Sequence, residues 1–120
     1  MPNKNTPKRS ITIGKKITQL MLDKKAASVD IIDVRKITSL TDFFVVCTSE
    51  SEPQSKAIHN HIKDELTKIG LKPWHSEGLE NSKWVLLDYV DIVVHVFSKE
   101  MREFYEFERL WADAKITRVE

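Results

Sequence analysis

The stretch WVLLDYVDIVVHVF, residues 84–97, decides the fold of this 120-residue chain. It contains two apolar runs rich in β-branched residues, and the short break between them is bounded by Asp88 and Asp91. Runs of this length and composition are typical of strands, and so short a break predicts a hairpin. Two-residue hairpin turns favour glycine or asparagine, because at least one position takes a positive φ. Since Tyr89 and Val90 occupy the break, we expect a looser connection.

The sequence before the hairpin predicts three further strands. Residues 43–48, FFVVCT, are apolar on both faces, which is typical of a strand in the middle of a covered sheet. Residues 31–36 form a shorter strand with a polar face, so we expect it near a sheet edge. A third strand is expected over residues 74–78.

Three segments have the residue spacing of helices. The first is expected over residues 11–27. The second begins at Ser51, which precedes Gln54 by the capping-box spacing, and it ends at Gly70. Its apolar stripe comprises Ala57, Ile58, Ile62, Leu66 and Ile69. A third helix lies within residues 102–111, where Phe104, Phe107 and Trp111 have the spacing of a core-facing side.

The order of these elements predicts an α/β fold. We expect a single domain over residues 11–120, with a mixed β-sheet of about five strands flanked by helices, and a flexible N-terminal tail over residues 1–10. One cysteine, Cys47, excludes an internal disulfide and fits a cytoplasmic protein, and we expect it to be a small buried apolar residue. No apolar run is long enough to span a bilayer, so no membrane partner is expected.

Charge and glycine content exclude several classes of function. The formal net charge of +1 argues against a protein whose main partner is bare nucleic acid. The three glycines are scattered, so the chain contains no phosphate-binding glycine loop. His59 and His61 lie about 200° apart on a helix and cannot share a metal, and His95 has the pattern of a core or edge histidine.

Acidic residues provide the one constellation with catalytic character. Glu50 and Glu52 follow the strand that ends at Thr48, and Asp88 and Asp91 flank the hairpin turn. A magnesium-dependent nucleotidyltransferase places paired carboxylates at such a strand end. It also needs a glycine-serine element for the phosphates, and this chain lacks one there. We therefore expect no catalytic site, no cofactor and no metal, and we keep a nucleotidyltransferase only as an alternative.

Ordered sequence motifs over about residues 20–114 resemble the ribosomal silencing factor family (RsfS, or Iojap-like). Two positions depart from the family pattern: Val90 stands where glycine is usual, and Phe107 where leucine is usual. The motifs that carry the resemblance are KA (25–26), DI (30–31), TDFFVVCT (41–48), Ser51 with Gln54, EG (77–78), WVLLDY (84–89), DIVVHVF (91–97), REFY (102–105) and ERLW (108–111).

This resemblance implies a fold like that of a degenerate nucleotidyltransferase and a function without catalysis. Family members bind the large ribosomal subunit at its protein fourteen and sterically block joining of the small subunit, which lowers translation when nutrients are scarce. An assembly or interaction factor for the large subunit, without that blocking activity, is the second alternative. Neither reading involves direct sequence-specific binding of nucleic acid.

An acidic and aromatic patch would suit a basic ribosomal protein, because the charges are complementary. The residues expected to build it are Glu77, Trp84, Leu87, Asp88, Tyr89 and Asp91. Strand alternation places Trp84, Leu86 and Asp88 on one face of the sheet, and Leu87 and Tyr89 on the other. In the absence of a ribosome, we expect a homodimer that covers the exposed apolar surface.

Overall fold

The computed structural model describes residues 6–105, 109 and 112–120. Its elements follow in the order α1 (Thr6–Asp23), β1 (Ala27–Asp33), β2 (Phe43–Ser49), α2 (Glu52–Lys68), β3 (His75–Glu77), β4 (Trp84–Asp88), β5 (Ile92–Ser98), α3 (Lys99–Tyr105) and β6 (Lys115–Arg118). The predicted α/β class with a mixed sheet is confirmed, with six strands rather than about five.

The six strands form one sheet in the order β3-β4-β5-β2-β1-β6. The central strands β2 and β5 are parallel, and every other neighbouring pair is antiparallel. The predicted hairpin is confirmed, because Trp84 pairs with Phe97 and Asp88 pairs with Val93. The apolar strand β2 lies in the middle of the sheet, as its sequence predicts.

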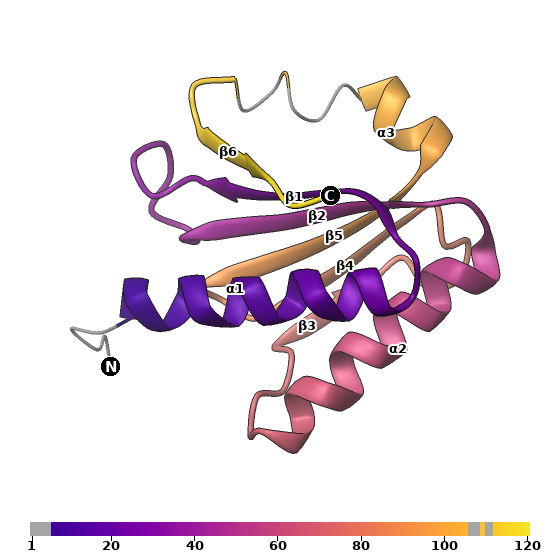
Figure 1. The fold of residues 1–120 in the computed structure, drawn as a ribbon, viewed down its shortest axis with the longest axis horizontal. Coiled ribbons are helices and arrows are strands. Elements are labelled where there is room, and N and C mark those ends of the chain that lie inside the picture. The colour runs from indigo at the N-terminus through magenta and orange to yellow at the C-terminus, as the bar shows by residue number, and fades with distance from the viewer. Residues whose placement is uncertain (1–5, 106–108, 110–111) are drawn as a thin grey trace.

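Helices α1 and α2 cover one face of the sheet, and α3 lies on the other side (Figure 1). The main core lies beneath α1 and α2, where Ile17, Met21 and Ile62 pack with strand residues such as Val45 and Leu87. A smaller cluster on the opposite face comprises Ile32, Val34, Val46 and Phe97, with Met101 of α3 packed against it.

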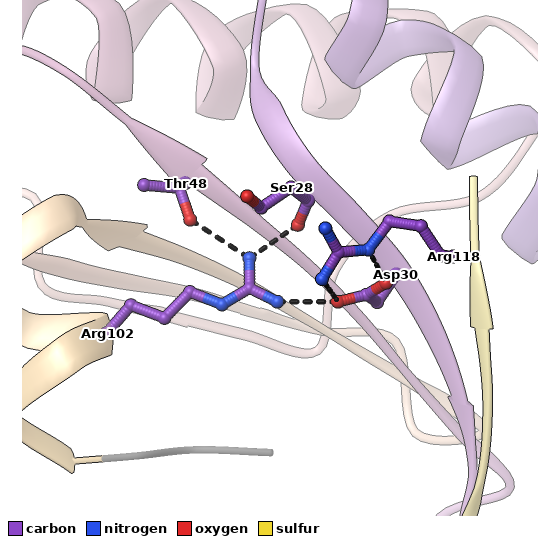
Figure 2. A network of polar contacts seen from close by, with 5 residues as sticks. All are labelled: Ser28, Asp30, Thr48, Arg102 and Arg118. Atoms are coloured by element: carbon purple, nitrogen blue, oxygen red, sulfur yellow. Dashed lines mark hydrogen bonds and ion pairs between the residues drawn. The ribbon is translucent and has the colours of Figure 1, made fainter. Parts of the chain in front are cut away.

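A buried network of polar contacts fixes the C-terminal part of the chain to the sheet (Figure 2). Asp30 of β1 is completely buried and accepts hydrogen bonds from Arg102 Nη2 at 2.6 Å and from Arg118 Nε at 2.5 Å. Arg102 also donates to the Ser28 carbonyl and to Thr48 Oγ1. A bulge between Ala27 and Asp30 interrupts the register of β1 at this place. One carboxylate therefore connects β1 with both α3 and β6.

Helix α2 begins as predicted, with one change in its cap. Ser51 Oγ accepts the Gln54 N–H at 3.1 Å, while Gln54 Oε1 accepts the N–H of Glu50 rather than that of Ser51. Its buried side is shifted from the predicted stripe, because Ala57 and Ile69 are exposed. Ser55 and His59 are buried instead, and they bond Ser49 Oγ and Ser76 Oγ respectively.

Several boundaries differ from the sequence predictions. Helix α1 begins at Thr6, so residues 6–10 of the expected flexible tail are helical, and Ser10 is buried. Strand β1 spans Ala27–Asp33 rather than 31–36, and the unpredicted β6 forms the edge beside it. Phe104 is exposed rather than in the core, whereas Phe107 and Trp111 lie outside the described residues.

The turn between β4 and β5 is tight, contrary to the looser connection that Tyr89 and Val90 suggest. The Tyr89 N–H donates to the Ile92 carbonyl at 2.8 Å, and the Asp91 N–H donates to the Tyr89 carbonyl at 2.9 Å. Val90 sits at the centre with φ of +73°, a conformation that a β-branched residue rarely adopts. Asp88 Oδ1 stabilises the turn by accepting the Val90 N–H at 2.7 Å.

Candidate functional site

An open groove crosses the sheet face that α1 and α2 leave uncovered. It has a volume of about 670 Å³. We call it the sheet groove and define it by its lining residues: Thr38, Leu40, Thr41, Phe44, Trp74, His75, Glu77, Leu86, Asp88, Val90, Val93 and His95. These come from β2 and the loop before it, from β3 and the residue before it, and from the β4–β5 hairpin.

The walls of the sheet groove expose large apolar side chains. Leu40 is 84% exposed, Trp74 is 76% exposed and Val90 is 55% exposed. Trp74 is fixed beside the hairpin by its backbone, because its N–H donates to the Asp88 carbonyl at 2.7 Å. Single exposed apolar residues are ordinary, but a cluster that lines one groove is typical of a binding surface.

The floor of the sheet groove is held in place by aromatic contacts. The Trp84 indole N–H donates to His95 Nδ1 at 3.0 Å, and Phe44 meets the His95 ring edge-on at a centroid distance of 5.0 Å. Phe97 also packs against Trp84, with the two rings tilted by 36° and their centroids 4.8 Å apart. Burial lowers the pKa of His95 to about 3, so the imidazole is neutral in the folded protein.

The charged side chains of the groove lining are acidic. Glu77 and Asp88 contribute carboxylates, and the described lining contains no lysine or arginine. His75 Nε2 lies 2.7 Å from Glu77 Oε2. The groove thus combines apolar walls with a negative rim, which suits a basic partner.

The structure brings together only part of the predicted partner-binding set. Glu77 and Asp88 line the sheet groove, and half-buried Trp84 lies on the same face, farther along β4. Asp91 is exposed at the turn but does not line the groove.

The other two predicted residues point to the helix-covered face. Leu87 is 1% exposed and belongs to the main core, so its prediction as a contact residue is wrong. Tyr89 packs against the same core, and burial raises its pKa to about 12. The predicted alternation of the strand is correct, but it places these two side chains beneath the helices.

Sequence reasoning missed the exposed apolar residues of the groove, which are Leu40, Trp74 and Val90. Leu40 and Trp74 lie outside regular strands, where periodicity carries no information about burial. The signal available for Val90 was its turn position, because a non-glycine residue at positive φ often marks a functional constraint.

The acidic residues considered for nucleotidyl transfer lie at opposite ends of the central strands. Glu50 follows β2, whereas Asp91 precedes β5, and these parallel strands pair from Phe43 with Ile92 to Ser49 with Ser98. At about 3.3 Å per residue the two ends are roughly 20 Å apart. Glu50 and Glu52 therefore cannot share a metal ion with Asp88 and Asp91.

The described residues offer no other site of this kind. Among them, no cluster of three or more His, Cys, Asp or Glu side chains is placed to hold a metal ion. Cys47 is buried as predicted, and desolvation raises its pKa to about 12, which makes it a poor nucleophile. No helix within the described ranges has the length and apolar character needed to cross a membrane.

Comparison with known proteins agrees with the fold and with the resemblance. Residues 7–120 match the sequence model of a family described as "Ribosomal silencing factor during starvation". The ribosomal silencing factor of Halalkalibacterium halodurans is 40% identical over 98 residues, covering 82% of this chain and 84% of the relative. That of Bacillus subtilis is 38% identical over 94 residues, covering 78% and 80%.

A crystal structure of a Chromobacterium violaceum protein has the same fold. It superposes with a TM-score of 0.82 at 34% sequence identity, and the match covers 91% of each chain. The family match over almost the whole sequence and the identity to curated relatives agree with this structural likeness. The chain therefore belongs to the family of ribosomal silencing factors.

Proposed function

We propose that this protein binds the large ribosomal subunit at its protein fourteen through the sheet groove and sterically blocks joining of the small subunit. It acts in the cytoplasm, lowers translation under nutrient limitation and catalyses no reaction. The resemblance to the family supplies the partner, and the groove supplies the docking surface.

The observation that carries this proposal is the exposure of Leu40, Trp74 and Val90 around one groove with an acidic rim. Apolar and aromatic side chains provide most of the binding energy of protein interfaces, and charges at the rim steer the encounter. Ribosomal proteins are mostly basic, so Glu77 and Asp88 are the suitable complement. A blocking factor requires only such a dock and enough bulk to occupy the space of the small subunit.

Among the residues predicted from the sequence, Glu77, Trp84 and Asp88 remain in the proposed dock. Trp84 supports it from beneath, through its hydrogen bond to His95. Leu87 and Tyr89 position the hairpin from the core side. In the free protein, the same apolar surface forms a homodimer, and the ribosome competes with that dimer.

The docking surface is tested by sedimentation of the protein with purified large subunits. Leu40→Ser and Trp74→Ala should each reduce co-sedimentation by about tenfold or more, because truncating an interface anchor costs roughly 1–4 kcal/mol. Ile69→Ser is the matched control, since Ile69 is also an exposed apolar residue but lies at the end of α2, outside the groove. Equal binding by all three variants would place the dock elsewhere.

The acidic rim is tested by comparing two aspartates of one turn. Asp88→Asn keeps an oxygen that accepts the Val90 N–H, so it removes charge without removing the turn contact. Asp91→Asn removes the charge of an exposed aspartate that does not line the groove. We expect Asp88→Asn to weaken binding and Asp91→Asn to have a smaller effect. The reverse order would contradict the assignment of the rim.

A further inference from the structure

The formal net charge of +1 conceals a separation of charge along the chain. The first 25 residues contain seven basic side chains and a single acidic one, whereas the other 95 residues contain twelve basic and seventeen acidic ones. Such an asymmetry indicates a polyanionic partner, such as nucleic acid or a membrane surface. The basic residues of this segment are Lys4, Lys8, Arg9, Lys15, Lys16, Lys24 and Lys25, and the acidic one is Asp23.

Helix α1 presents part of this charge to solvent. Lys15 and Lys16 are exposed, and neither forms an ion pair within the part of the chain that the structure describes. In the sequence, Lys8 and Arg9 precede them by seven residues, which is about two helical turns. Asp23, in the last turn, is the one acidic residue of the helix. The positive charge of Lys15 and Lys16 is therefore available to a partner.

Helix α2, on the same face of the sheet, provides a contrast. It contains three lysines and three acidic residues, and Lys68 Nζ pairs with Glu65 Oε2 at 2.7 Å. A mixed charge pattern of this kind is typical of an ordinary solvated helix surface. The excess of positive charge thus belongs to α1 and is not a general property of the helical layer.

The apolar side of α1 decides between the two classes of polyanion. Ile17 and Met21 are completely buried in the main core, so this side cannot enter the interfacial region of a bilayer. The backbone phosphates of nucleic acid require only exposed basic side chains. RNA therefore fits α1 better than a membrane surface does.

The basic helix begins at the end of the sheet where the sheet groove lies. The hydroxyl of Ser10, which is buried in α1, donates to the Asp42 carboxylate, and the Asp42 N–H donates to the Asp91 carbonyl at 2.9 Å. These contacts place the first half of α1 near the loop before β2 and the β4–β5 turn, which contribute Leu40 and Val90 to the groove (Figure 1). One end of the molecule consequently carries an acidic groove and a basic helix, on opposite faces of the sheet.

This separation of charge suits a ribonucleoprotein surface. Ribosomal proteins are mostly basic, whereas the RNA around them carries one negative charge per nucleotide. An acidic groove is complementary to the protein, and a basic helix is complementary to the RNA. A surface with evenly mixed charges would match neither component.

We propose that Lys15 and Lys16 of α1 bind backbone phosphates of the large-subunit ribosomal RNA next to protein fourteen. This inference rests on the proposed function and adds an RNA contact to its protein dock. Phosphate contacts position a protein without reading sequence. Helix α1 therefore strengthens and orients binding, while the sheet groove selects the protein partner.

The test compares the affinity for purified large subunits with the affinity for purified protein fourteen, each at about 50 and 200 mM KCl. Lys15→Gln combined with Lys16→Gln removes two charges at exposed positions, where glutamine is a good helix former. Each lost phosphate contact lowers the slope of log affinity against log salt by about 0.7–0.9. Between the two salt concentrations, the affinity of the wild type for large subunits should therefore fall about tenfold more than that of the double variant. The affinities of both for protein fourteen should be equal.

Two further double variants are the controls. Lys56→Gln with Lys63→Gln removes the same charge from exposed positions of α2 and should retain the salt dependence of the wild type. Lys15→Arg with Lys16→Arg keeps the charge and should also behave like the wild type. Equal effects of the α1 and α2 glutamine variants would show a general attraction between charges and would overturn the assignment to α1.

The inference and the proposed function fail in different ways. If the folded wild type binds neither large subunits nor protein fourteen, the proposed function falls and this inference falls with it. If the wild type binds both, and the α1 glutamine variant has the same salt dependence, only the RNA contact is refuted. An equal loss on purified protein fourteen would assign the lysines to a protein contact. Binding of the wild type alone to phosphatidylglycerol vesicles, with unchanged binding to large subunits, would assign α1 to a membrane surface.

Discussion

Replacing Asp30 should cost more stability than replacing any surface charge of the molecule. The carboxylate of Asp30 is completely buried and accepts hydrogen bonds from Arg102 Nη2 at 2.6 Å, Arg118 Nε at 2.5 Å and Arg118 Nη2 at 3.0 Å. Asp30→Ala removes all three bonds and takes away the negative charge that balances the buried Arg102 guanidinium. Figure 2 shows that both arginines converge on this single side chain.

The magnitude follows from the burial of the two charges. Removing one partner of a buried ion pair typically costs about 3–5 kcal/mol, because the remaining charge stays in a poorly solvated place. That is a large share of the roughly 5–15 kcal/mol that stabilises an ordinary domain. Arg118→Ala is the control: its side chain is 56% exposed and Asp30 keeps its bond to Arg102, so its loss should cost less than that of Asp30.

Urea denaturation followed by circular dichroism measures the free energies of unfolding of Asp30→Ala and Arg118→Ala. Native-state hydrogen exchange should also show faster exchange in β6 of Asp30→Ala, because Arg118 anchors this strand to β1. A loss below about 1 kcal/mol in Asp30→Ala, or equal losses in Asp30→Ala and Arg118→Ala, would refute the reasoning from burial.

Three further outcomes are expected. The pKa of His95 is about 3 in the folded protein and about 6.5 when unfolded, so the stability it contributes is complete above about pH 7 and is lost as the pH falls, by up to about 1.4 kcal/mol per pH unit. In His95→Gln, the free energy of unfolding should therefore fall less steeply between pH 7 and 4.5, and an unchanged pH dependence would contradict this. Val90→Gly should raise the free energy of unfolding by roughly 0.5–1 kcal/mol, since glycine adopts φ of +73° without strain. A loss of stability in the same denaturation assay would show that the contacts of the valine side chain contribute more than the relief of backbone strain. Light scattering at micromolar concentration should detect a free homodimer, and Trp84→Ala should weaken both the dimer and ribosome binding. A strictly monomeric protein would refute the dimer prediction, and a Trp84→Ala variant that still dimerises but no longer binds ribosomes would show that the two surfaces are separate.

Periodicity predicted the central part of the fold because those segments are long and strongly patterned. The hairpin, the apolar strand β2 and the capped helix α2 all lie where the sequence places them. Strand β6 was missed because Lys115–Arg118 contains one apolar residue, and all four of its residues are exposed. Its pairing depends on contacts with β1, including the ion pair between Arg118 and Asp30, which no local pattern reveals.

The candidate site was harder to predict than the fold. Alternation correctly separated Trp84, Leu86 and Asp88 from Leu87, but it does not tell which face the helices cover. The turn was misjudged because steric preference disfavours Val90 at positive φ, whereas Asp88 Oδ1 and the hairpin hydrogen bonds stabilise that conformation. Leu40 and Trp74 join the groove only after β3 and the loop before β2 are placed beside the hairpin.

Sedimentation of mixed large and small subunits, with and without the protein, shows directly whether it blocks subunit joining. We predict that the wild type migrates with large subunits and reduces the amount of joined ribosomes, and that Trp74→Ala combined with Asp88→Asn abolishes both effects. Ile69→Ser should behave like the wild type. Undiminished joining while the protein migrates with large subunits would contradict steric blocking, and it would instead indicate an assembly or interaction factor that does not block the small subunit.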